Sequence, residues 1–247
     1  MYNPYSLEGK TILVTGASSG IGRQTAIEAS RLGARIIASA RDKERLEETL
    51  SMLEGSGHSF IIADLSIDEQ VEDLASQVEP LDGFSCNAGI PGGQLVLFYK
   101  EEQIENVFKV NTFSAMMLTR HLLKKKKLKR GASVVYTSSA GNVFCAAIAN
   151  GIYGASKCAL DGFMRSAAIE LAAKGIRCNS VNPSVVMTAF QKNSGITQEQ
   201  YQKELANYPL GRFGTPVDVA LAICFLLSDA SSFITGTAVK IDGGSTL

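Results

Sequence analysis

Short apolar runs alternate with longer amphipathic stretches along most of the chain, and this pattern predicts its secondary structure. A run rich in β-branched residues, such as TILVT at 11–15, is typical of a buried strand, whereas apolar residues every three or four positions indicate a helix. Strands are expected at 11–15, 34–40, 59–63, 81–86, 133–138, 176–181 and 237–241. Helices are expected at 20–32, 41–53, 68–78, 101–127, 153–174 and 217–227.

The regular alternation of strands and helices indicates βαβ units, which form a parallel sheet with helices on both faces. Because their crossovers are right-handed, such units build a doubly wound sheet. We therefore expect an α/β protein with a Rossmann-type fold, in which residues 1–247 form a single domain. Ligands of such sheets bind beyond the carboxyl ends of the strands, so polar residues at those ends are the candidates for function.

Charge and cysteine content narrow the functional classes. Among 247 residues there are 24 Lys and Arg and 24 Asp and Glu, a balance that argues against a dedicated nucleic-acid binder. The longest apolar run, 219–227, is about half of the roughly 20 residues that a membrane-spanning helix needs. The N-terminus lacks the basic and apolar regions of a secretory signal. Five cysteines without a CxxC pair and two histidines predict reduced thiols, no metal site and a cytoplasmic location.

A glycine-rich turn joins the first expected strand to the first expected helix. It reads TGASSGIG and contains Gly16, Gly20 and Gly22. Glycines let the chain turn tightly and let a phosphate approach the backbone, and the helix N-terminus offers free N–H groups to that phosphate. The pattern predicts a dinucleotide site. Its spacing differs from G-x-G-x-x-G, so a tight turn without a ligand is the alternative.

The end of the second expected strand bears on the choice between NADP and NAD. An acidic residue there binds the ribose 2′-hydroxyl, whereas an arginine accommodates a 2′-phosphate. Ala40 occupies the expected acidic position and Arg41 follows it, which favours NADP. Asp42 could compete and NAD is the alternative, while Arg41 could also simply begin the next helix.

Tyr153 and Lys157 are four residues apart and therefore share one face of the expected helix. An ammonium group favours a nearby phenolate, so Lys157 is expected to lower the pKa of Tyr153, together with a positively charged nicotinamide ring. A positioned tyrosine hydroxyl could then protonate a carbonyl oxygen as hydride reaches its carbon. A Tyr-x-x-x-Lys pair also arises by chance, and its interpretation depends on its partners.

The partners are hydroxyls and an amide. Ser138 and Ser139 follow a strand, where serine is usually a turn or cap residue but could also donate a hydrogen bond to a substrate oxygen. Asn111 lies within an expected helix, where asparagine is mildly unfavourable. It indicates a kink, a water site, a buried hydrogen bond or a solvent-facing side chain.

Together these residues resemble the short-chain dehydrogenase/reductase family across nearly the whole chain. The matching pieces are TGASSGIG at 15–22, Asp64-Leu65, Asn87-Ala88-Gly89, Asn111, Ser138-Ser139, Tyr153 with Lys157, Asn182-Pro183 with Thr188, and Ile241-Asp242-Gly243-Gly244. The resemblance implies an NADP-dependent oxidoreductase, with NAD possible, that reduces a ketone or oxidises the matching secondary alcohol. It also implies a homotetramer or homodimer.

The resemblance implies roles for four catalytic residues. Tyr153 would be the general acid in reduction and the base in oxidation. Lys157 would lower the pKa of Tyr153 and hold the nicotinamide ribose, and Ser139 would orient the substrate carbonyl, with Ser138 as a minority candidate for that hydroxyl. Asn111 would hold a water that relays protons.

The resemblance also implies the cofactor contacts. Asp64 would bind the adenine amine, Asn87 would lie beside the adenosine ribose and brace the central strand, and Thr188 would hold the nicotinamide carboxamide. The full set is Gly16, Ser18, Ser19, Gly20, Ile21, Gly22, Arg41, Asp64, Leu65, Asn87, Ala88, Gly89, Tyr153, Lys157, Pro183, Val186 and Thr188.

Three positions depart from the family pattern. Ser184 replaces the usual glycine after Pro183, which puts the local backbone near the nicotinamide in doubt. Cys86 replaces the first asparagine of Asn-Asn-Ala-Gly. The segment between Ser139 and Gly141 is one residue shorter than the common pattern.

The substrate is suggested by weaker signals. In the family, the segment 189–212 is a mobile lid that sets substrate choice, and here it is polar. Phe144, Val186 and Phe190 are candidates for the pocket or for the core.

A basic run at 124–130 is interpreted mainly as a solvated helix end. The chain also resembles beta-ketoacyl-acyl-carrier-protein reductases, in which basic residues in this region dock the acidic acyl carrier protein, and the resemblance makes this reductase activity the leading specific expectation. Sugar, steroid and small-alcohol dehydrogenases share the same motifs. A non-catalytic dinucleotide sensor is the alternative from another class, but such proteins typically lose the tyrosine or the lysine.

Overall fold

The computed structural model describes residues 2–188 and 197–247. Its strands are β1 Thr11–Thr15, β2 Arg35–Ala40, β3 Ser59–Ile62, β4 Leu81–Cys86, β5 Leu128–Thr137, β6 Arg177–Pro183 and β7 Ala238–Ile241. Its α-helices are α1 Gly20–Arg31, α2 Lys43–Ser51, α3 Asp68–Gln77, α4 Glu101–Phe108, α5 Ser114–Lys124, α6 Gly151–Leu171, α8 Gln198–Leu205 and α9 Pro216–Leu227. Shorter helical turns are η1 Val96–Phe98, η2 Lys109–Phe113, η3 Ala172–Lys174 and η4 Asp229–Ser231.

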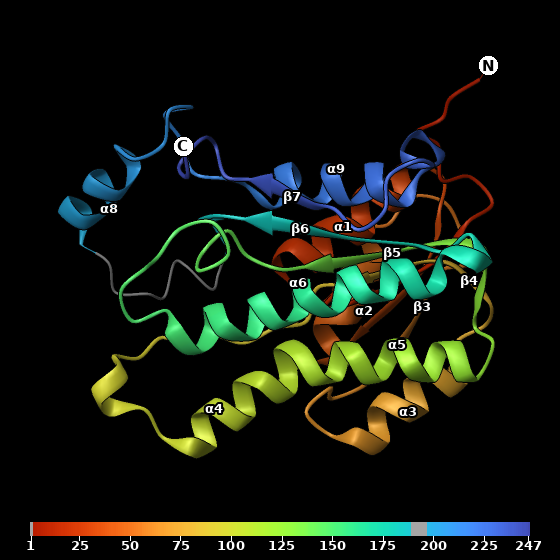
Figure 1. Ribbon diagram of the computed structural model, residues 1–247. Helices are drawn as coiled ribbons and strands as arrows, with labels where there is room; N and C mark the ends of the chain where they lie inside the picture. The colour runs from red at the N-terminus through yellow and green to blue at the C-terminus, as the bar shows by residue number, and fades with distance from the viewer. Residues whose placement is uncertain (1, 189–196) are drawn as a thin grey trace.

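The seven strands form one parallel sheet with the order β3-β2-β1-β4-β5-β6-β7 (Figure 1). The chain runs outward from β1 to β3, returns to β4 beside β1, and then runs outward again to β7. This order confirms the predicted Rossmann-type, doubly wound α/β fold. The direction of winding reverses between β1 and β4, and ligands of such folds bind at that point, beyond the carboxyl ends of the strands.

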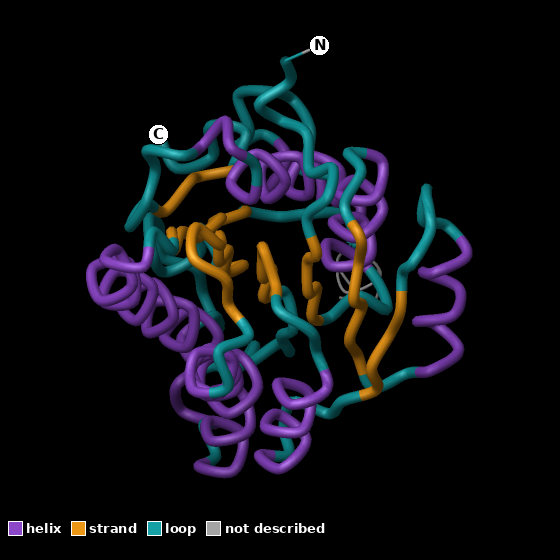
Figure 2. The backbone as a smooth tube through the Cα atoms, turned by 90° about the vertical axis from the view of Figure 1, so that its right-hand side faces the viewer, coloured by secondary structure: helices purple, strands orange, loops and turns teal. Residues whose placement is uncertain are grey.

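Helices cover both faces of the sheet, as Figure 2 shows along the strands. Helices α1 and α9 pack together on one face, while α3 packs against α5 and α6 lies over β6 on the other. Each layer closes its own apolar core. Leu13, Phe84 and Val134 face the second layer, and their neighbours Ile12 and Val135 face the first. This alternation is what the short apolar strands predict, because successive side chains point to opposite faces.

The single helix predicted at 101–127 is interrupted. Helices α4 and α5 are joined by η2, a π-helical turn. Asn111, in η2, is buried and its side chain bonds to the main chain of Ile90 on a neighbouring segment. A π-helical turn widens the ladder of main-chain hydrogen bonds and is frequent at functional sites. The kink and buried-hydrogen-bond interpretations of Asn111 are thereby confirmed, and the solvent-facing one is wrong.

Two further boundaries differ from the prediction. Strand β5 begins at Leu128, five residues before the predicted strand. Its pairing with β4 changes register between Leu81 and Gly83, and Gly131 within it adopts a φ of 78°. That irregularity hides the strand from a search for apolar alternation. Helix α8 lies within the stretch 189–212 that was predicted to be a lid, and residues 189–196 of that stretch lie outside the described residues.

Candidate active site

The glycine turn after β1 has no room for a side chain at Gly16 or at Gly22. A Cβ on Gly22 would lie 2.3 Å from the main-chain oxygen of Gly16, and a Cβ on Gly16 would lie 2.9 Å from the nitrogen of Ala88. Gly16 and Gly20 also have positive φ angles of 65° and 55°. These glycines therefore let the turn fold against the segment after β4, across the point where the winding reverses.

Helix α1 begins directly after this turn, and its first main-chain N–H groups lack a side-chain acceptor. Ser19 occupies the N-cap position, but its side chain makes no cap hydrogen bond. The first-turn amides of Gly20, Ile21 and Gly22 therefore lack the side-chain acceptor that usually satisfies one of them. An N-terminus of this kind, beside a glycine-rich turn, fits the pyrophosphate of a dinucleotide.

Arg23, on α1, links the turn to α2, a contact that the sequence did not indicate. Its Nη2 donates to the main-chain oxygen of Ser18 at 2.6 Å and pairs with Glu48 at 2.7 Å. From α2 the hydroxyl of Thr49 donates to the main-chain oxygen of Ala17 at 2.9 Å. Both contacts fix the loop carbonyls and leave the amides of the next turn facing the site.

The end of β2 presents Arg41 rather than an acid. Asp42 is the N-cap of α2, and its carboxylate accepts a hydrogen bond from the Arg45 amide at 3.1 Å. The exposed guanidinium of Arg41 lies 3.7 Å from an Asp64 oxygen. Although partial burial acts to raise the pKa of Asp64, hydrogen bonds from Ser66 and the charge of Arg41 bring it below its ordinary value. Asp42 is thus engaged elsewhere, and Arg41 is the residue available to a ribose phosphate.

The end of β4 is tied to the strands on either side. The Asn87 amide nitrogen of the main chain donates to Thr15 Oγ1 at 3.2 Å, and its side-chain oxygen accepts from Thr137 Oγ1 at 2.6 Å. Asn87 therefore bridges β1, β4 and β5, the bracing role that the family resemblance implied. Leu65, expected at the cofactor, is buried in the apolar core of the α3–α5–α6 layer.

Tyr153 and Ser139 meet at the carboxyl end of β5. Tyr153 lies in the first turn of α6, and its hydroxyl is hydrogen-bonded to the Ser139 side chain. Ser139 Oγ also accepts a hydrogen bond from the amide of Gly141 at 3.2 Å. The neighbouring Ser138 is buried and donates to the main-chain oxygen of Lys157 at 3.1 Å. The structure therefore brings Ser139, and not Ser138, to the tyrosine.

Lys157 is 3% exposed, and its Nζ lies 5.7 Å from the centre of the Tyr153 ring. Nζ donates to the main-chain oxygen of Thr137 at 2.8 Å. Burial lowers the pKa of Lys157 to about 8, while the charges of Cys86 and Asp161 act to raise it. The pKa of Cys86 itself is raised to about 11 by burial, so its thiol is neutral near pH 7.

The pKa of Tyr153 is not lowered in the protein without a bound nucleotide, and its lowering by Lys157 together with the nicotinamide ring stays a prediction. Burial raises the pKa of Tyr153 to about 12, and the hydrogen bond with Ser139 only partly offsets this effect. Desolvation disfavours the phenolate more than the neighbouring groups favour it. The tyrosine is therefore a phenol, a proton donor, over the whole neutral range.

Asn111 lies beside this pair but its side chain is fully used. Its Oδ1 accepts from the amide of Ile90 at 2.8 Å, and its Nδ2 donates to Ile90 O at 3.0 Å and to Ser156 Oγ at 3.1 Å. A Cβ on Gly89 would lie 3.3 Å from Asn111 Oδ1 and 3.4 Å from Lys157 Nζ. Gly89 thus leaves open the space in which Asn111 and Lys157 face the end of β4.

The end of β6 closes the opposite wall. The main-chain oxygen of Pro183 accepts from the amide of Ala140 at 2.8 Å, so it is linked to the residue after Ser139. Val186 is buried and forms an isolated bridge with Gly214. A Cβ on Gly20 would lie 3.4 Å from the Thr188 methyl group, so Thr188 lies over the start of α1. This contact places Thr188 beside the expected phosphate site.

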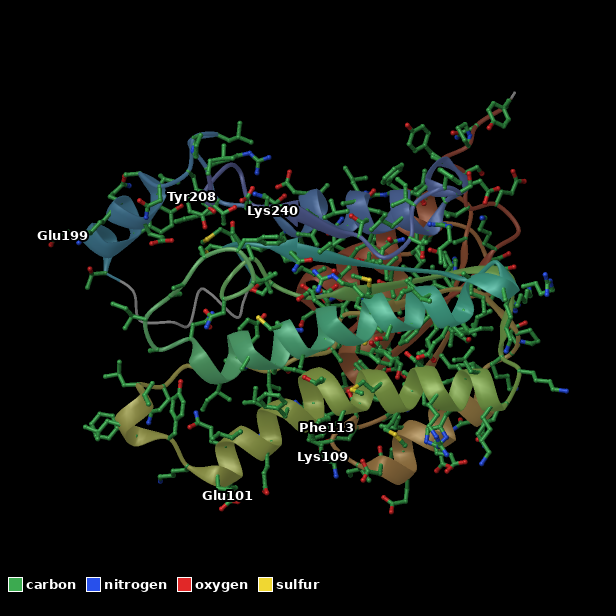
Figure 3. The ribbon with its side chains drawn as sticks, viewed as in Figure 1. Glu101, Lys109, Phe113, Glu199, Tyr208 and Lys240 are labelled. Carbon is green, nitrogen blue, oxygen red and sulfur yellow. The ribbon has the colours of Figure 1, made fainter. Side chains whose placement is uncertain are left out.

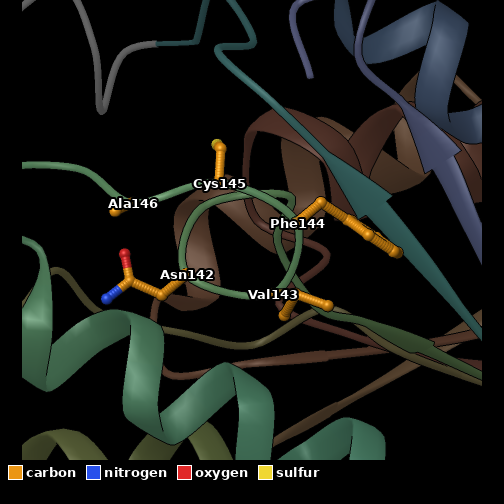
Figure 4. Close-up of a pocket in the computed structure, with 5 residues that line it drawn as sticks. All are labelled: Asn142, Val143, Phe144, Cys145 and Ala146. Carbon is orange, nitrogen blue, oxygen red and sulfur yellow. The ribbon is translucent and has the colours of Figure 1, made fainter. Parts of the chain in front are cut away.

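A shallow pocket of about 300 Å³ lies in the loop after Ser139, lined by residues 142–146 (Figure 4). Phe144, one of the lining residues, is half exposed and supports the ammonium of Lys240, 5.3 Å from its ring centre. Lys240 lies on β7 (Figure 3). Of the three expected pocket residues, Phe144 thus faces a pocket and Val186 is buried, while Phe190 lies outside the described residues.

The basic run at 124–130 lies away from this site. It joins α5 to the amino end of β5, whereas Ser139 follows the carboxyl end of the same strand. Lys125 pairs with Glu72 at 3.0 Å and Lys129 pairs with Asp82 at 2.7 Å. The run is therefore only in part a helix end, since α5 ends at Lys124 and β5 begins at Leu128.

Comparisons with known proteins agree with this architecture. A solved structure titled short chain dehydrogenase/reductase family protein shares 31% identity, covers 98% of this chain and 99% of its own, and superposes with a TM-score of 0.86. A family model described as "Enoyl-(Acyl carrier protein) reductase" matches residues 16–246. The chain belongs to the short-chain dehydrogenase/reductase family. It is accordingly an oxidoreductase of this family, which uses a nicotinamide dinucleotide.

Curated relatives within the short-chain dehydrogenase/reductase family share much of the sequence. A 3-oxoacyl-[acyl-carrier-protein] reductase of Buchnera aphidicola is 34% identical, with 96% of this chain and 98% of the relative aligned. One of Thermotoga maritima is also 34% identical over the same shares. A solved short-chain type dehydrogenase/reductase of Mycobacterium ulcerans is 27% identical, with 98% of this chain and 91% of that one covered and a TM-score of 0.88.

None of the helices within 2–188 and 197–247 is long and apolar enough to cross a membrane. The same ranges hold no group of three or more His, Cys, Asp or Glu side chains that could bind a metal ion.

The sequence analysis did not identify Asp161 as a candidate functional residue. It is buried on α6, one turn after Lys157, and accepts a hydrogen bond from Asn182 at 2.7 Å. The available signal was an acidic residue between the apolar Leu160 and Met164, one helical turn after Lys157.

Proposed function

We propose that this protein is an NADP-dependent reductase of 3-oxoacyl thioesters, with the keto group reduced to a secondary alcohol. The observation that carries the proposal is the Tyr153 hydroxyl, a phenol at neutral pH, hydrogen-bonded to Ser139 and backed by the Lys157 ammonium. A proton donor of this kind suits reduction, because the carbonyl oxygen needs a proton as hydride reaches its carbon. The curated relatives act on 3-oxoacyl chains, which gives the substrate class.

Each residue has a separate task in this proposal. Tyr153 gives its proton to the substrate oxygen, and Ser139 donates a second hydrogen bond that fixes the carbonyl. The positive charge of Lys157 stabilises the tyrosinate that remains after proton transfer. Lys157 also binds the nicotinamide ribose hydroxyls. The Asn87 bridge and the main-chain bonds of Asn111 hold the loops around these groups in place. The Asn111 side chain is occupied by hydrogen bonds to Ile90 and Ser156. We therefore propose that the main chain of Asn111 binds the relay water.

The cofactor fits the glycine-rich turn. A nicotinamide dinucleotide supplies the hydride when bound. We assign its pyrophosphate to the first-turn amides of α1 after Gly16, its adenine to Asp64, and its carboxamide to Thr188. Arg41 favours NADP over NAD, because its guanidinium is exposed at the end of β2 while Asp42 caps α2. The proposed contacts also include Ser18, Ser19, Leu65, Ala88, Pro183 and Val186.

The acyl chain is proposed to enter at the carboxyl edge of the sheet, where the pocket beside Phe144 opens. A carrier protein bearing that chain then approaches the same edge. The segment 189–212 stays a predicted lid over it.

A second copy of this chain is the partner that the outer helices favour. Phe113 is 53% exposed at the α4–α5 junction (Figure 3), Met117 is 38% exposed on α5 and Ile169 is 81% exposed on α6. Large apolar groups gathered in one helical layer often mark an interface. We therefore propose a homodimer or homotetramer, and light scattering on the wild type and on F113D checks it: the substitution should lower the mass.

Replacement of Tyr153 by phenylalanine tests the proposed chemistry. NADPH oxidation is followed with acetoacetyl thioesters, with sugars and steroid ketones as the comparison panel. Y153F should lose turnover by about a thousandfold or more while NADPH still quenches or enhances protein fluorescence. Unchanged turnover in Y153F would remove the catalytic assignment, and turnover confined to sugars or steroids would replace the acyl substrate class by another.

A further inference from the structure

Asp161 is a buried carboxyl group that the proposed chemistry does not use. It is 1% exposed on α6. Its Oδ2 accepts one hydrogen bond, from Asn182 Nδ2 at 2.7 Å, and its Oδ1 is buried without a hydrogen-bond partner among the described residues. Burying a carboxylate with so few donors is costly, so a fold that keeps one there gains something from its charge or its geometry.

Asn182 links Asp161 to the main chain of Ser139. Asn182 lies near the end of β6, fully buried, and its Nδ2 donates to Asp161 and also, at 3.2 Å, to the main-chain oxygen of Ser139. Its Oδ1 accepts from Ser180 Oγ at 3.0 Å. A carboxylate can only accept, so Asp161 fixes which end of the Asn182 amide faces Ser139. The amide orientation in turn holds the Ser139 backbone.

The charge of Asp161 acts on Lys157. The titratable groups around the Lys157 ammonium are Cys86 on β4, together with Tyr153 and Asp161 on α6. Burial raises the pKa of Cys86 to about 11 and that of Tyr153 to about 12, so both are neutral near pH 7. Asp161 lies one turn after Lys157 among the buried residues of α6, and its charge acts against the effect of burial on the ammonium.

We propose that Asp161 is a positioning residue: its carboxylate keeps the Lys157 ammonium protonated and, through Asn182, orients Ser139. The proposal rests on the proposed function, since it matters for catalysis only if Tyr153, Ser139 and Lys157 do the chemistry. It gives a reason for burying an acid on α6 one turn after Lys157.

The test is a direct titration of Lys157. Protein labelled with 13C at lysine Cε is titrated by NMR, and K157R identifies the Lys157 signal by its loss. D161N keeps the side-chain shape and an oxygen for Asn182 but removes the charge. The Lys157 midpoint should fall by about one pH unit or more in D161N. D73N, which removes an exposed carboxylate on α3, should leave it unchanged.

Kinetics provide the second readout. The alkaline limb of kcat/KM in D161N should move to lower pH by the same amount as the NMR midpoint, which loss of packing alone would not produce. If D161N does not fold, D161S removes the same charge with less volume. A Lys157 midpoint that stays at its wild-type value in the folded variant overturns the proposal. Retained turnover in Y153F would instead overturn the proposed function and leave this titration standing as a separate result.

Discussion

The Lys157 ammonium donates a hydrogen bond to the main-chain oxygen of Thr137 at 2.8 Å. Thr137 ends β5, two residues before Ser139, and its hydroxyl donates to Asn87 at 2.6 Å. One threonine thus links the lysine on α6 with the asparagine after β4. The relation fixes the lysine relative to the strand that precedes Ser139, so the lysine is held by a main-chain contact as well as by its place on α6.

The pKa of Lys157 predicts the pH dependence of reduction. Burial lowers this pKa to about 8, so the free protein carries the ammonium below pH 8 and loses it above. Tyr153, with a pKa of about 12, stays protonated throughout. We expect kcat/KM for the keto substrate to fall above about pH 8, by about tenfold per unit. In K157R the guanidinium stays charged, and the alkaline limb should move upward. A profile that is flat to pH 10 contradicts the assignment.

The same shift predicts an effect on stability. A lysine with an ordinary pKa of 10.5 and a folded value of about 8 binds its proton more weakly in the folded state. Below pH 8 it is charged in both states, and the folded state carries a penalty of about 3 kcal/mol. Between 8 and 10.5 the unfolded state binds more protons, so stability rises with pH and the penalty fades.

K157M removes this titration. After loss of the hydrogen bond to Thr137, which contributes about 1 kcal/mol, we expect K157M to be more stable than wild type by about 2 kcal/mol at pH 7. The difference should shrink toward pH 10. Urea denaturation at both pH values measures it, and a pH-independent difference would mean that Lys157 carries no buried charge.

The sequence predicted the fold because its strands are short, apolar and regularly spaced, as in β1 and β4. It also predicted Tyr153 with Lys157, since their spacing on a helix brings them to one face. It could not predict that burial overrides the lysine at Tyr153, because desolvation depends on what packs around the ring. It could not choose between Ser138 and Ser139, or detect Asp161, for the same reason: each depends on partners from β6 and α6.

The glycine turn predicts a large difference between two glycine substitutions. In G22A the new Cβ would lie 2.3 Å from a main-chain oxygen, so the turn must open. We expect a loss of about 2 kcal/mol or more in the free energy of unfolding and a loss of NADPH binding. G162A is the matched control in α6, where no atom lies within 4 Å of the added Cβ. It should stabilise the protein by about 0.5–1 kcal/mol. Equal effects of the two would contradict the tight turn.

We expect Arg41 to determine the preference for NADPH over NADH. R41A removes the guanidinium at the end of β2, and the KM for NADPH should rise about tenfold or more while that for NADH changes little. R45A is the control, because Arg45 is also exposed but faces Asp42 at 3.4 Å. Initial rates with both cofactors measure the effect. If R41A raises both KM values alike, Arg41 does not read the 2′-phosphate.

The position of the basic run predicts that it does not dock the carrier protein. Strand β5 has 10 residues, so its ends are about 30 Å apart, with Lys129 and Arg130 at one end and Ser139 beyond the other. A carrier protein that delivers its chain at the carboxyl edge cannot at the same time lie on the amino edge of the same subunit. In K129E/R130E, turnover of carrier-linked and of small thioester substrates should therefore change by the same factor. A selective loss with the carrier-linked substrate would show that the run docks the carrier, across the molecule or from a neighbouring subunit.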